Sequence, residues 1–242
     1  RTAWEIGKAI AQEVLETYAQ EHGEWPKSVF LDLWASTSMR TGGDDLAQAF
    51  AFLGVRPKWD DASTRVNGFE ILPLALLGRA RVDVTLRISG LFRDVFPMQI
   101  ALFDAAVKAV AALDEPLEDN PLVAKHLTDQ RIFGSAPGTY GLGLGETLAR
   151  GTWQTRDDLG NAYIAANSYA YGTAGDGVKS DAFAARVAAT DAFVHVQDMA
   201  GQDVLDSDAF AQNEGGFAAA AASLGKAPAI YHTDNTLNSP KV

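Results

Sequence analysis

The densest group of polar side chains lies late in the chain, and its residue types suit a divalent cation. One imidazole and four carboxylates fall within fourteen residues: His195, Asp198, Asp203, Asp206 and Asp208. Imidazole nitrogen and carboxylate oxygen are suitable ligands for cobalt-like and magnesium-like ions. His195, Asp198 and Asp203 are therefore candidate metal ligands. The alternative is an acidic loop in which Asp206 caps a helix that begins near Asp208.

A glycine-rich stretch in the second half of the chain offers backbone donors. The turn formed by Gly138, Thr139 and Tyr140 precedes a predicted helix, and amides at such a turn can bind a carboxylate or a phosphate. The stretch has neither a P-loop motif nor the spacing of a dinucleotide fingerprint, so a plain structural loop is the alternative. Glu146 could act as a general base, although a Glu in a first helical turn also suits the helix dipole.

Arg93 follows the clearest strand pattern of the chain. Residues 82–88 alternate apolar and polar side chains with a period of two, which predicts a strand. A short turn then leads into a helix with Pro97 in its first turn. The guanidinium of Arg93 could pair with a carboxylate of a substrate, or with Asp94 or Asp83.

Predicted helices and strands must position these candidate side chains. Residues 4–20 carry a helical stripe, residues 29–34 form an apolar strand, and a helix follows the glycine turn at 41–45. This order predicts an α/β fold with a mostly parallel sheet and flanking helices, Rossmann-like in its N-terminal part. Ligands of such sheets bind at the carboxyl ends of the strands, where the 39–45 and 89–94 turns would lie.

The second half of the chain differs in composition from the first. Acidic residues and prolines cluster at 114–121, which predicts an α/β subdomain over residues 1–117 and a second subdomain over 118–242. The second subdomain is expected to be richer in helix and glycine. Helical patterns cover 158–170, 181–196 and 208–224, and residues 227–231 could form a last strand.

Composition limits the function. The 242 residues include no cysteine, which excludes disulfides, thiolate nucleophiles and iron–sulfur clusters. The formal net charge of −11 argues against nucleic acid as a partner. No apolar run reaches the length of a membrane span and no signal peptide is evident, so we expect a cytoplasmic protein. The start without methionine and the abrupt end suggest an internal fragment of a longer polypeptide.

Several stretches resemble one family of large chelatase subunits, which includes cobaltochelatases of the CobN type and magnesium chelatases of the H-subunit type. These stretches are 38–48, 53–57, 81–84, 89–96, 131–141 and 195–208, and they follow the same order as in the family. The pattern His195-x-Gln197-Asp198 and the run from Met39 to Gly43 favour the cobalt branch. The run Met199–Gln202 departs from it, because that stretch is often more basic there, which weakens a metal role for the loop.

The resemblance implies a role in cobalamin biosynthesis. It implies a large subunit that binds a corrin precursor of the hydrogenobyrinic acid a,c-diamide type and inserts cobalt(II) as a substrate. The enzyme would be an ATP-dependent ligase that forms nitrogen–metal bonds, and the isolated fragment is expected to be inactive. AAA+ ATPase and adaptor subunits would be the partners and would use the ATP and Mg. The absence of a Walker motif in this chain fits that division.

Under this interpretation the candidate residues take specific roles. Arg93 and the turn of Gly138, Thr139 and Tyr140 are expected to contact the tetrapyrrole. His195 and Glu146 are the candidate proton acceptors. Three alternatives stay open: a magnesium chelatase of the H-subunit type acting on protoporphyrin in chlorophyll biosynthesis, a non-catalytic module that docks the ATPase subunits, and, last in rank, a nucleotide-binding domain.

Overall fold

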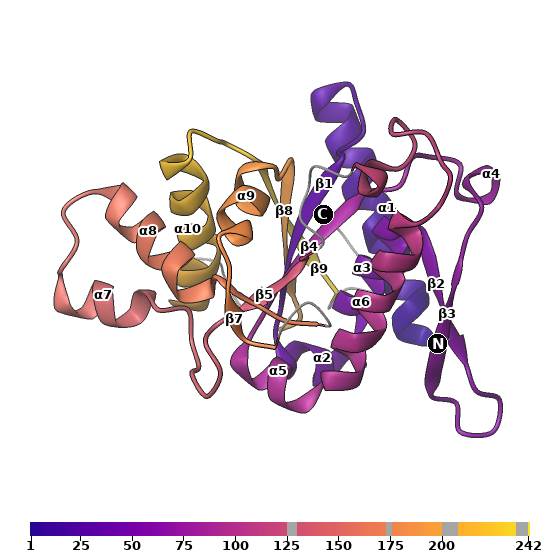
Figure 1. Cartoon of the computed structure of the whole chain (residues 1–242), viewed down its shortest axis with the longest axis horizontal. Helices are drawn as coiled ribbons and strands as arrows, with labels where there is room; N and C mark the ends of the chain where they lie inside the picture. Colours follow the sequence, from indigo (N-terminus) through magenta and orange to yellow (C-terminus); the bar gives the residue numbers. More distant parts are fainter. Residues whose placement is uncertain (125–129, 173–175, 200–207, 236–241) are drawn as a thin grey trace.

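A mostly parallel sheet runs through the molecule, with helices on both faces (Figure 1). The computed structural model describes residues 1–124, 130–172, 176–199, 208–235 and 242. The strands are β1 (Ser28–Leu33), β2 (Val55–Trp59), β3 (Val66–Ile71), β4 (Asp83–Ile88), β5 (Ile132–Gly134), β6 (Tyr169–Ala170), β7 (Val178–Lys179), β8 (Ala192–Gln197) and β9 (Ala229–Asp234). The seven-stranded sheet has the order β7-β6-β5-β4-β1-β8-β9. The pairs among β5, β4, β1, β8 and β9 are parallel, and β6 and β7 add an antiparallel edge.

The helices connect these strands and cover both faces of the sheet. They are α1 (Thr2–His22), α2 (Ala35–Thr41), α3 (Asp44–Leu53), α4 (Leu74–Leu77), α5 (Gly90–Val95), α6 (Pro97–Ala111), the 3-10 helix η1 (Pro121–Val123), α7 (Leu144–Arg150), α8 (Arg156–Asn167), α9 (Ala182–Ala188) and α10 (Asp208–Ser223). Pro97 stands in the first turn of α6, as predicted.

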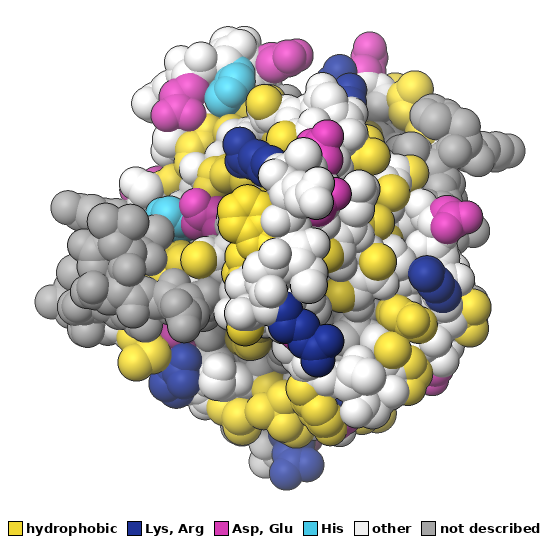
Figure 2. Space-filling model, turned by 90° about the vertical axis from the view of Figure 1, so that its left-hand side faces the viewer, with side chains coloured by type: hydrophobic (Ala, Val, Ile, Leu, Met, Phe, Trp, Pro, Cys, Tyr) yellow, Lys and Arg dark blue, Asp and Glu magenta, His cyan; other side chains and the backbone are white. Residues whose placement is uncertain are grey.

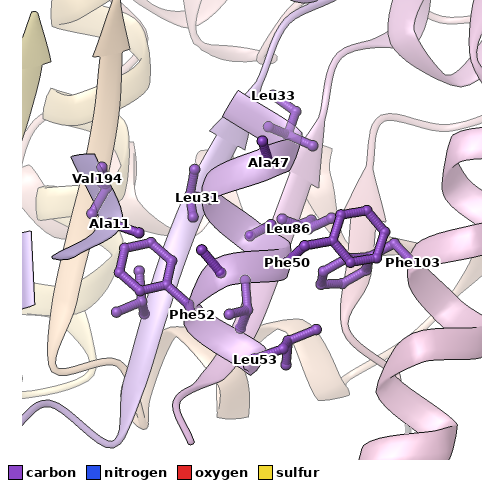
Figure 3. Packing of buried hydrophobic residues seen from close by; sticks show 14 of the residues in the cluster. Ala11, Leu31, Leu33, Ala47, Phe50, Phe52, Leu53, Leu86, Phe103 and Val194 are labelled. Atoms are coloured by element: carbon purple, nitrogen blue, oxygen red, sulfur yellow. The ribbon is translucent and has the colours of Figure 1, made fainter. Parts of the chain in front are cut away.

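Two apolar cores lie on opposite faces of the sheet. Strand side chains alternate between the faces, so Leu31 and Leu86 belong to one core and Phe30 to the other. The first core packs under α1, α3 and α6, and Figure 3 shows Phe50 and Phe52 of α3 at its centre. The second packs under α8, α9 and α10 and is rich in aromatic rings. The predicted α/β fold with a mostly parallel sheet is confirmed.

One predicted helix is wrong in its second half. The 181–196 pattern forms α9 only to Ala188, and residues 192–197 form β8, whose neighbours in the sheet are β1 and β9. The alanine-rich start favours a helix. The sequence from Ala192 to Val196 instead contains aromatic and β-branched residues that suit a buried strand. His195 therefore lies on a strand.

The predicted division near residue 117 does not divide the sheet. Strands β1 and β4 precede that position, while β5, β8 and β9 follow it, and all five are hydrogen-bonded in one sheet. Whether 1–117 and 118–242 fold as separate units stays a prediction. In the described residues, no helix is long and apolar enough to cross a membrane.

The side of the molecule that carries α7, α8 and α10 has a mixed surface. Figure 2 shows Lys and Arg side chains scattered over this side, with hydrophobic side chains gathered along its lower margin. Leu148 of α7 and the nearby Trp153 are large hydrophobic residues that are exposed. This side therefore presents apolar side chains to the solvent among dispersed charges.

Candidate functional site

The carboxyl edge of the sheet gathers segments that are far apart in the sequence. The five parallel strands end on this edge, because parallel strands share one direction. The segments that follow them are the 135–140 turn after β5, α5 after β4, α2 after β1, residues 198–199 after β8 and residue 235 after β9. Most of the residues expected to be functional lie in or beside these segments.

Arg93 is held by protein groups at this edge. Its Nε donates to Oδ1 of Asp94 at 2.7 Å, and Nη1 donates to the carbonyl of Ala136 at 2.9 Å. A longer contact of 3.4 Å joins Nη1 to the carbonyl of Thr139. The hydrogen bond to Asp94 raises the pKa of the guanidinium despite partial burial. Arg93 thus anchors the 135–140 turn against α5.

The turn itself presents one aromatic ring to solvent. Tyr140 is 65% exposed, and its hydroxyl donates to Asp94 at 2.6 Å. Gly138 has a φ of +74°, a conformation that favours glycine. The hydroxyl of Thr139 donates to the carbonyl of Ala136, which tightens the turn. The turn therefore offers an ordered, exposed surface beside a cation.

A buried ion pair lies inside the sheet beneath the edge. Asp32 of β1 and Arg87 of β4 face each other in register and form an ion pair. Arg87 Nη2 donates to Oδ1 of Asn213 on α10 at 2.9 Å, and its guanidinium lies 4.7 Å from the ring centre of Trp34. Burial makes such a pair costly unless hydrogen bonds complete it. The pair therefore ties α10 to the sheet close to His195.

His195 is buried next to a second histidine. It is 7% exposed, it faces His232 across the β8–β9 register, and its ring centre lies 4.5 Å from that of Phe210. Burial lowers its pKa, so the imidazole is neutral at neutral pH. Within the described residues its Nδ1 has no hydrogen-bond partner. The ring nitrogen Nε2 of His232 is in hydrogen-bond contact with a carboxylate oxygen of Glu214 on α10. A neutral imidazole of this kind can accept a proton or bind a metal ion.

Of the other two predicted metal ligands, one pairs with an arginine and the other lies outside the described residues. Asp198 accepts a hydrogen bond from Nε of Arg40 at 2.6 Å, which ties β8 to α2. Asp203 lies outside the described residues. In the part of the chain that the structure describes, no three His, Cys, Asp or Glu side chains stand close enough to hold a metal ion. The metal assignment of His195, Asp198 and Asp203 stays a prediction.

Glu146 lies on an exposed helix. The side chain is on the surface of α7 and forms an ion pair with Arg150 one turn later. Exposed pairs of this spacing contribute a few tenths of a kcal/mol, roughly 0.3–0.5. The contacts of Glu146 are those of an ordinary surface helix, and its role as a general base stays a prediction.

Two neighbouring carboxylates at the start of α3 are buried beside the edge. Burial raises the pKa of Asp44, and it raises the pKa of Asp45 to about 7. A hydrogen bond from Ser38 at 2.7 Å offsets part of the effect at Asp45. Asp198 adds to both shifts through its negative charge. The folded protein therefore holds protons here that an unfolded chain would release.

Replacing Asp45 with Asn should flatten the pH dependence of stability. Because the pKa is raised on folding, the wild-type free energy of unfolding falls as the pH rises from about 4 to about 7. A shift of this size corresponds to an effect on the order of 4 kcal/mol. Asp45→Asn should therefore be the more stable protein at pH 8, as measured by urea unfolding. Asp61→Asn, at a fully exposed side chain, is the control. Parallel curves for wild type and Asp45→Asn would contradict the assignment.

Several residues that pair across the sheet are absent from the sites predicted from the sequence. The sequence-based prediction gives no role to Asp32, Arg87, Asn213 or Glu214. Asp32, Arg87 and Glu214 nevertheless act electrostatically on His195, and Asn213 binds Arg87. For Asp32 and Arg87, which lie within apolar strands, the sequence did indicate a buried charge. A charged residue within an apolar strand of a parallel sheet must be buried, and a buried charge requires a partner.

The chain is similar to large chelatase subunits along its whole length. The sequence model of a family described as CobN/Magnesium Chelatase matches residues 1–242. The aerobic cobaltochelatase subunit CobN of Sinorhizobium sp. is 46% identical over an alignment of 255 positions, which covers 97% of this chain and 20% of that protein. The H-type magnesium-chelatase subunit of Cereibacter sphaeroides is 36% identical over an alignment of 196 positions, which covers 75% of this chain and 16% of that protein.

A solved structure shows the same fold. The catalytic subunit of cobaltochelatase from Mycobacterium tuberculosis matches with a TM-score of 0.96 and 42% identity, over 100% of this chain and 22% of that one. The chain therefore spans about a fifth of the length of the relatives that it matches.

Proposed function

The chain belongs to the CobN/magnesium chelatase family, and from that premise we propose that it forms part of the large subunit of a cobaltochelatase. The observation that carries the proposal is 46% identity to a CobN subunit over 97% of the chain. The cobalt branch is favoured because the H-type magnesium-chelatase subunit is 36% identical over only 75% of the chain. The substrate in this proposal is a corrin precursor of the hydrogenobyrinic acid a,c-diamide type.

The chemistry of metal insertion requires three things of the protein. It must hold a large macrocycle, replace water around a divalent cation, and accept two pyrrole protons. In our proposal the carboxyl edge of the sheet contributes to these tasks. Tyr140, with Thr139 and Gly138, would contact the periphery of the ring, and Arg93 would keep that turn in place beside it.

The metal and proton roles fall to the β8 region. His195 is neutral and lacks a partner for Nδ1 in the described part, which suits a proton acceptor or a ligand. Asp198 and Asp203 would assist in receiving the cobalt(II) substrate. The ATPase and adaptor partners, the ATP and Mg that they use, and a cytoplasmic location belong to the same proposal.

Reconstitution of the full-length subunit tests this proposal. The subunit would be mixed with its ATPase and adaptor partners, ATP, Mg and Co²⁺, and either the corrin precursor or protoporphyrin. We expect cobalt to enter the corrin, seen as a change in the absorbance spectrum, and no magnesium to enter protoporphyrin. Magnesium insertion into protoporphyrin would favour the magnesium branch. Partner binding without any corrin binding would favour a docking module.

A further inference from the structure

A large groove opens beside the predicted site, on the other side of α5. It has a volume of about 680 Å³ and lies between α1, α3, the start of α6 and the β2–β3 hairpin. Its size falls within the range of about 300–1,000 Å³ that is typical of small-molecule and cofactor sites. None of the residues predicted from the sequence to bind substrate or metal lines it. The groove is therefore a separate candidate for binding.

The walls of the groove are apolar and aromatic. Trp4, Trp59, Phe92 and Phe96 line it. Met98, 76% exposed, stands at its margin on α6, and Met39 at the end of α2 is also exposed. Flat aromatic walls and adaptable thioether side chains suit a large, flat, apolar ligand. Such a ligand would bind favourably against these two methionines, because it would remove their apolar surface from water.

Two cations border this apolar surface. Arg65 on the β2–β3 turn has no ion-pair partner among the described residues. Arg1 forms a 3.5 Å pair with Asp61, but both side chains are exposed, so the pair is weak. The chain as a whole carries a formal net charge of −11, so two arginines beside an apolar groove stand out. This combination complements a ligand with an apolar body and carboxylates at its periphery.

We propose that this groove holds the flat body of a carboxylate-bearing tetrapyrrole, with Arg65 and Arg1 directed to peripheral carboxylates. This inference rests on the proposed function and deepens it by locating the macrocycle. The proposal is supported by a connection between the groove and the carboxyl edge of the sheet. Phe92 lines the groove from α5, and the next residue, Arg93, anchors the 135–140 turn. Helix α5 therefore has one residue in the groove and the next residue bound to the turn expected to contact the ring.

A charged group placed in the groove tests this site. Met98→Asp adds a carboxylate to the first turn of α6, where the helix dipole favours a negative charge, so the fold should be retained. In the full-length subunit we expect the dissociation constant for the corrin precursor, from an absorbance titration, to rise at least about tenfold, since a charge replaces an apolar side chain that the bound ligand would cover. Leu76→Asp is the matched control, because Leu76 is 77% exposed and lies outside the groove. Its dissociation constant should equal that of the wild type.

A second experiment tests the carboxylate contact. Arg65→Ala should weaken binding of the corrin precursor by up to about fivefold, the range of a solvent-accessible charged contact. It should leave the binding of a fully amidated analogue unchanged, because that analogue has no carboxylate to lose. An equal loss for both ligands would show that Arg65 acts through packing and would overturn the carboxylate assignment.

The outcomes separate this inference from the proposed function. If the wild-type subunit inserts cobalt but Met98→Asp binds the corrin precursor as tightly as wild type, the groove is not the binding site. The proposed function would then still stand. If Met98→Asp inserts cobalt more slowly but binds the corrin precursor with unchanged affinity, another part of the assembly occupies the groove. That result would also disprove the proposed binding site. Wild-type subunit that binds no corrin would overturn the proposed function itself.

Discussion

Replacing Asp83 with Ala should lower the free energy of unfolding by about 3–5 kcal/mol, because it removes the carboxylate that two buried arginines share. Asp83 accepts from Nε of Arg131 at 2.8 Å and from Nη1 of Arg186 at 2.7 Å. All three side chains are almost completely buried. Arg186 also donates to the hydroxyl of Thr85, so it cannot turn toward solvent without breaking that bond. Urea unfolding of the 242-residue chain measures the loss.

Two further variants separate the charge from the volume of the side chain. Asp83→Asn keeps the size and part of the hydrogen bonding, and should lose less than Asp83→Ala. A triple variant in which Asp83 becomes Leu, and Arg131 and Arg186 become Met, removes all of the buried charge. It should recover much of the stability, as apolar replacement of buried ionic groups often does. A loss below about 1 kcal/mol for Asp83→Ala would contradict the assigned role.

The cluster of Asp83, Arg131 and Arg186 also determines the direction in which stability changes with pH. Burial alone would raise the pKa of Asp83, but the guanidinium groups of Arg186 and Arg131 outweigh burial and lower it. Because its pKa is lower in the folded state, Asp83 stabilises the fold at pH values above its unfolded pKa of about 3.9. This stabilisation is lost as the pH falls through the folded pKa. Asp83→Asn should therefore unfold with a weaker dependence on pH in the acid range.

Much of the fold follows from local patterns in the sequence. The alternation in residues 82–88 reflects a strand between two packed faces, and Pro97 fits the first turn of a helix. The carboxyl edge could be predicted as well, since parallel strands with helical crossovers bring their following turns together. Strand β8 could not be separated from the helix before it, because alanine-rich and β-branched segments adjoin without a glycine or proline between them.

The partners of the site residues could not be predicted, for a physical reason. Arg87 meets Asn213 across a separation of 126 residues, and the contact depends on how α10 packs on the sheet. His232 and Glu214 are likewise brought together by that packing. Arg93 had a sequence neighbour as one partner, Asp94, but its carbonyl acceptors come from a turn more than forty residues later. Sequence patterns indicate which face a residue occupies, and tertiary packing determines what it contacts there.

Replacing His195 with Ala in the full-length subunit should slow cobalt insertion by about a hundredfold or more, since a positioned proton acceptor contributes about 10²–10⁴-fold. The imidazole is neutral, buried, and without a partner for Nδ1 in the described part of the chain. An unpaired buried nitrogen is costly, which argues that it is kept for a ligand or a proton. Corrin affinity should stay close to the wild-type value, because loss of a proton acceptor slows the reaction without removing the contacts that hold the ring. Insertion is measured by absorbance and the affinity for Co²⁺ by equilibrium dialysis.

The matched control for this variant is His22→Ala. His22 lies in the last turn of α1, is exposed, and stacks on Tyr18, so its loss should leave insertion unchanged. Thermal unfolding distinguishes a chemical role from a packing role, because the His195 ring also contacts Phe210. His195→Gln fills most of the space and keeps a hydrogen-bonding group, so it should restore stability but not the rate. Recovery of both would show that His195 serves the packing of α10 on the sheet, and an unchanged rate and Co²⁺ affinity in His195→Ala would remove it from the mechanism.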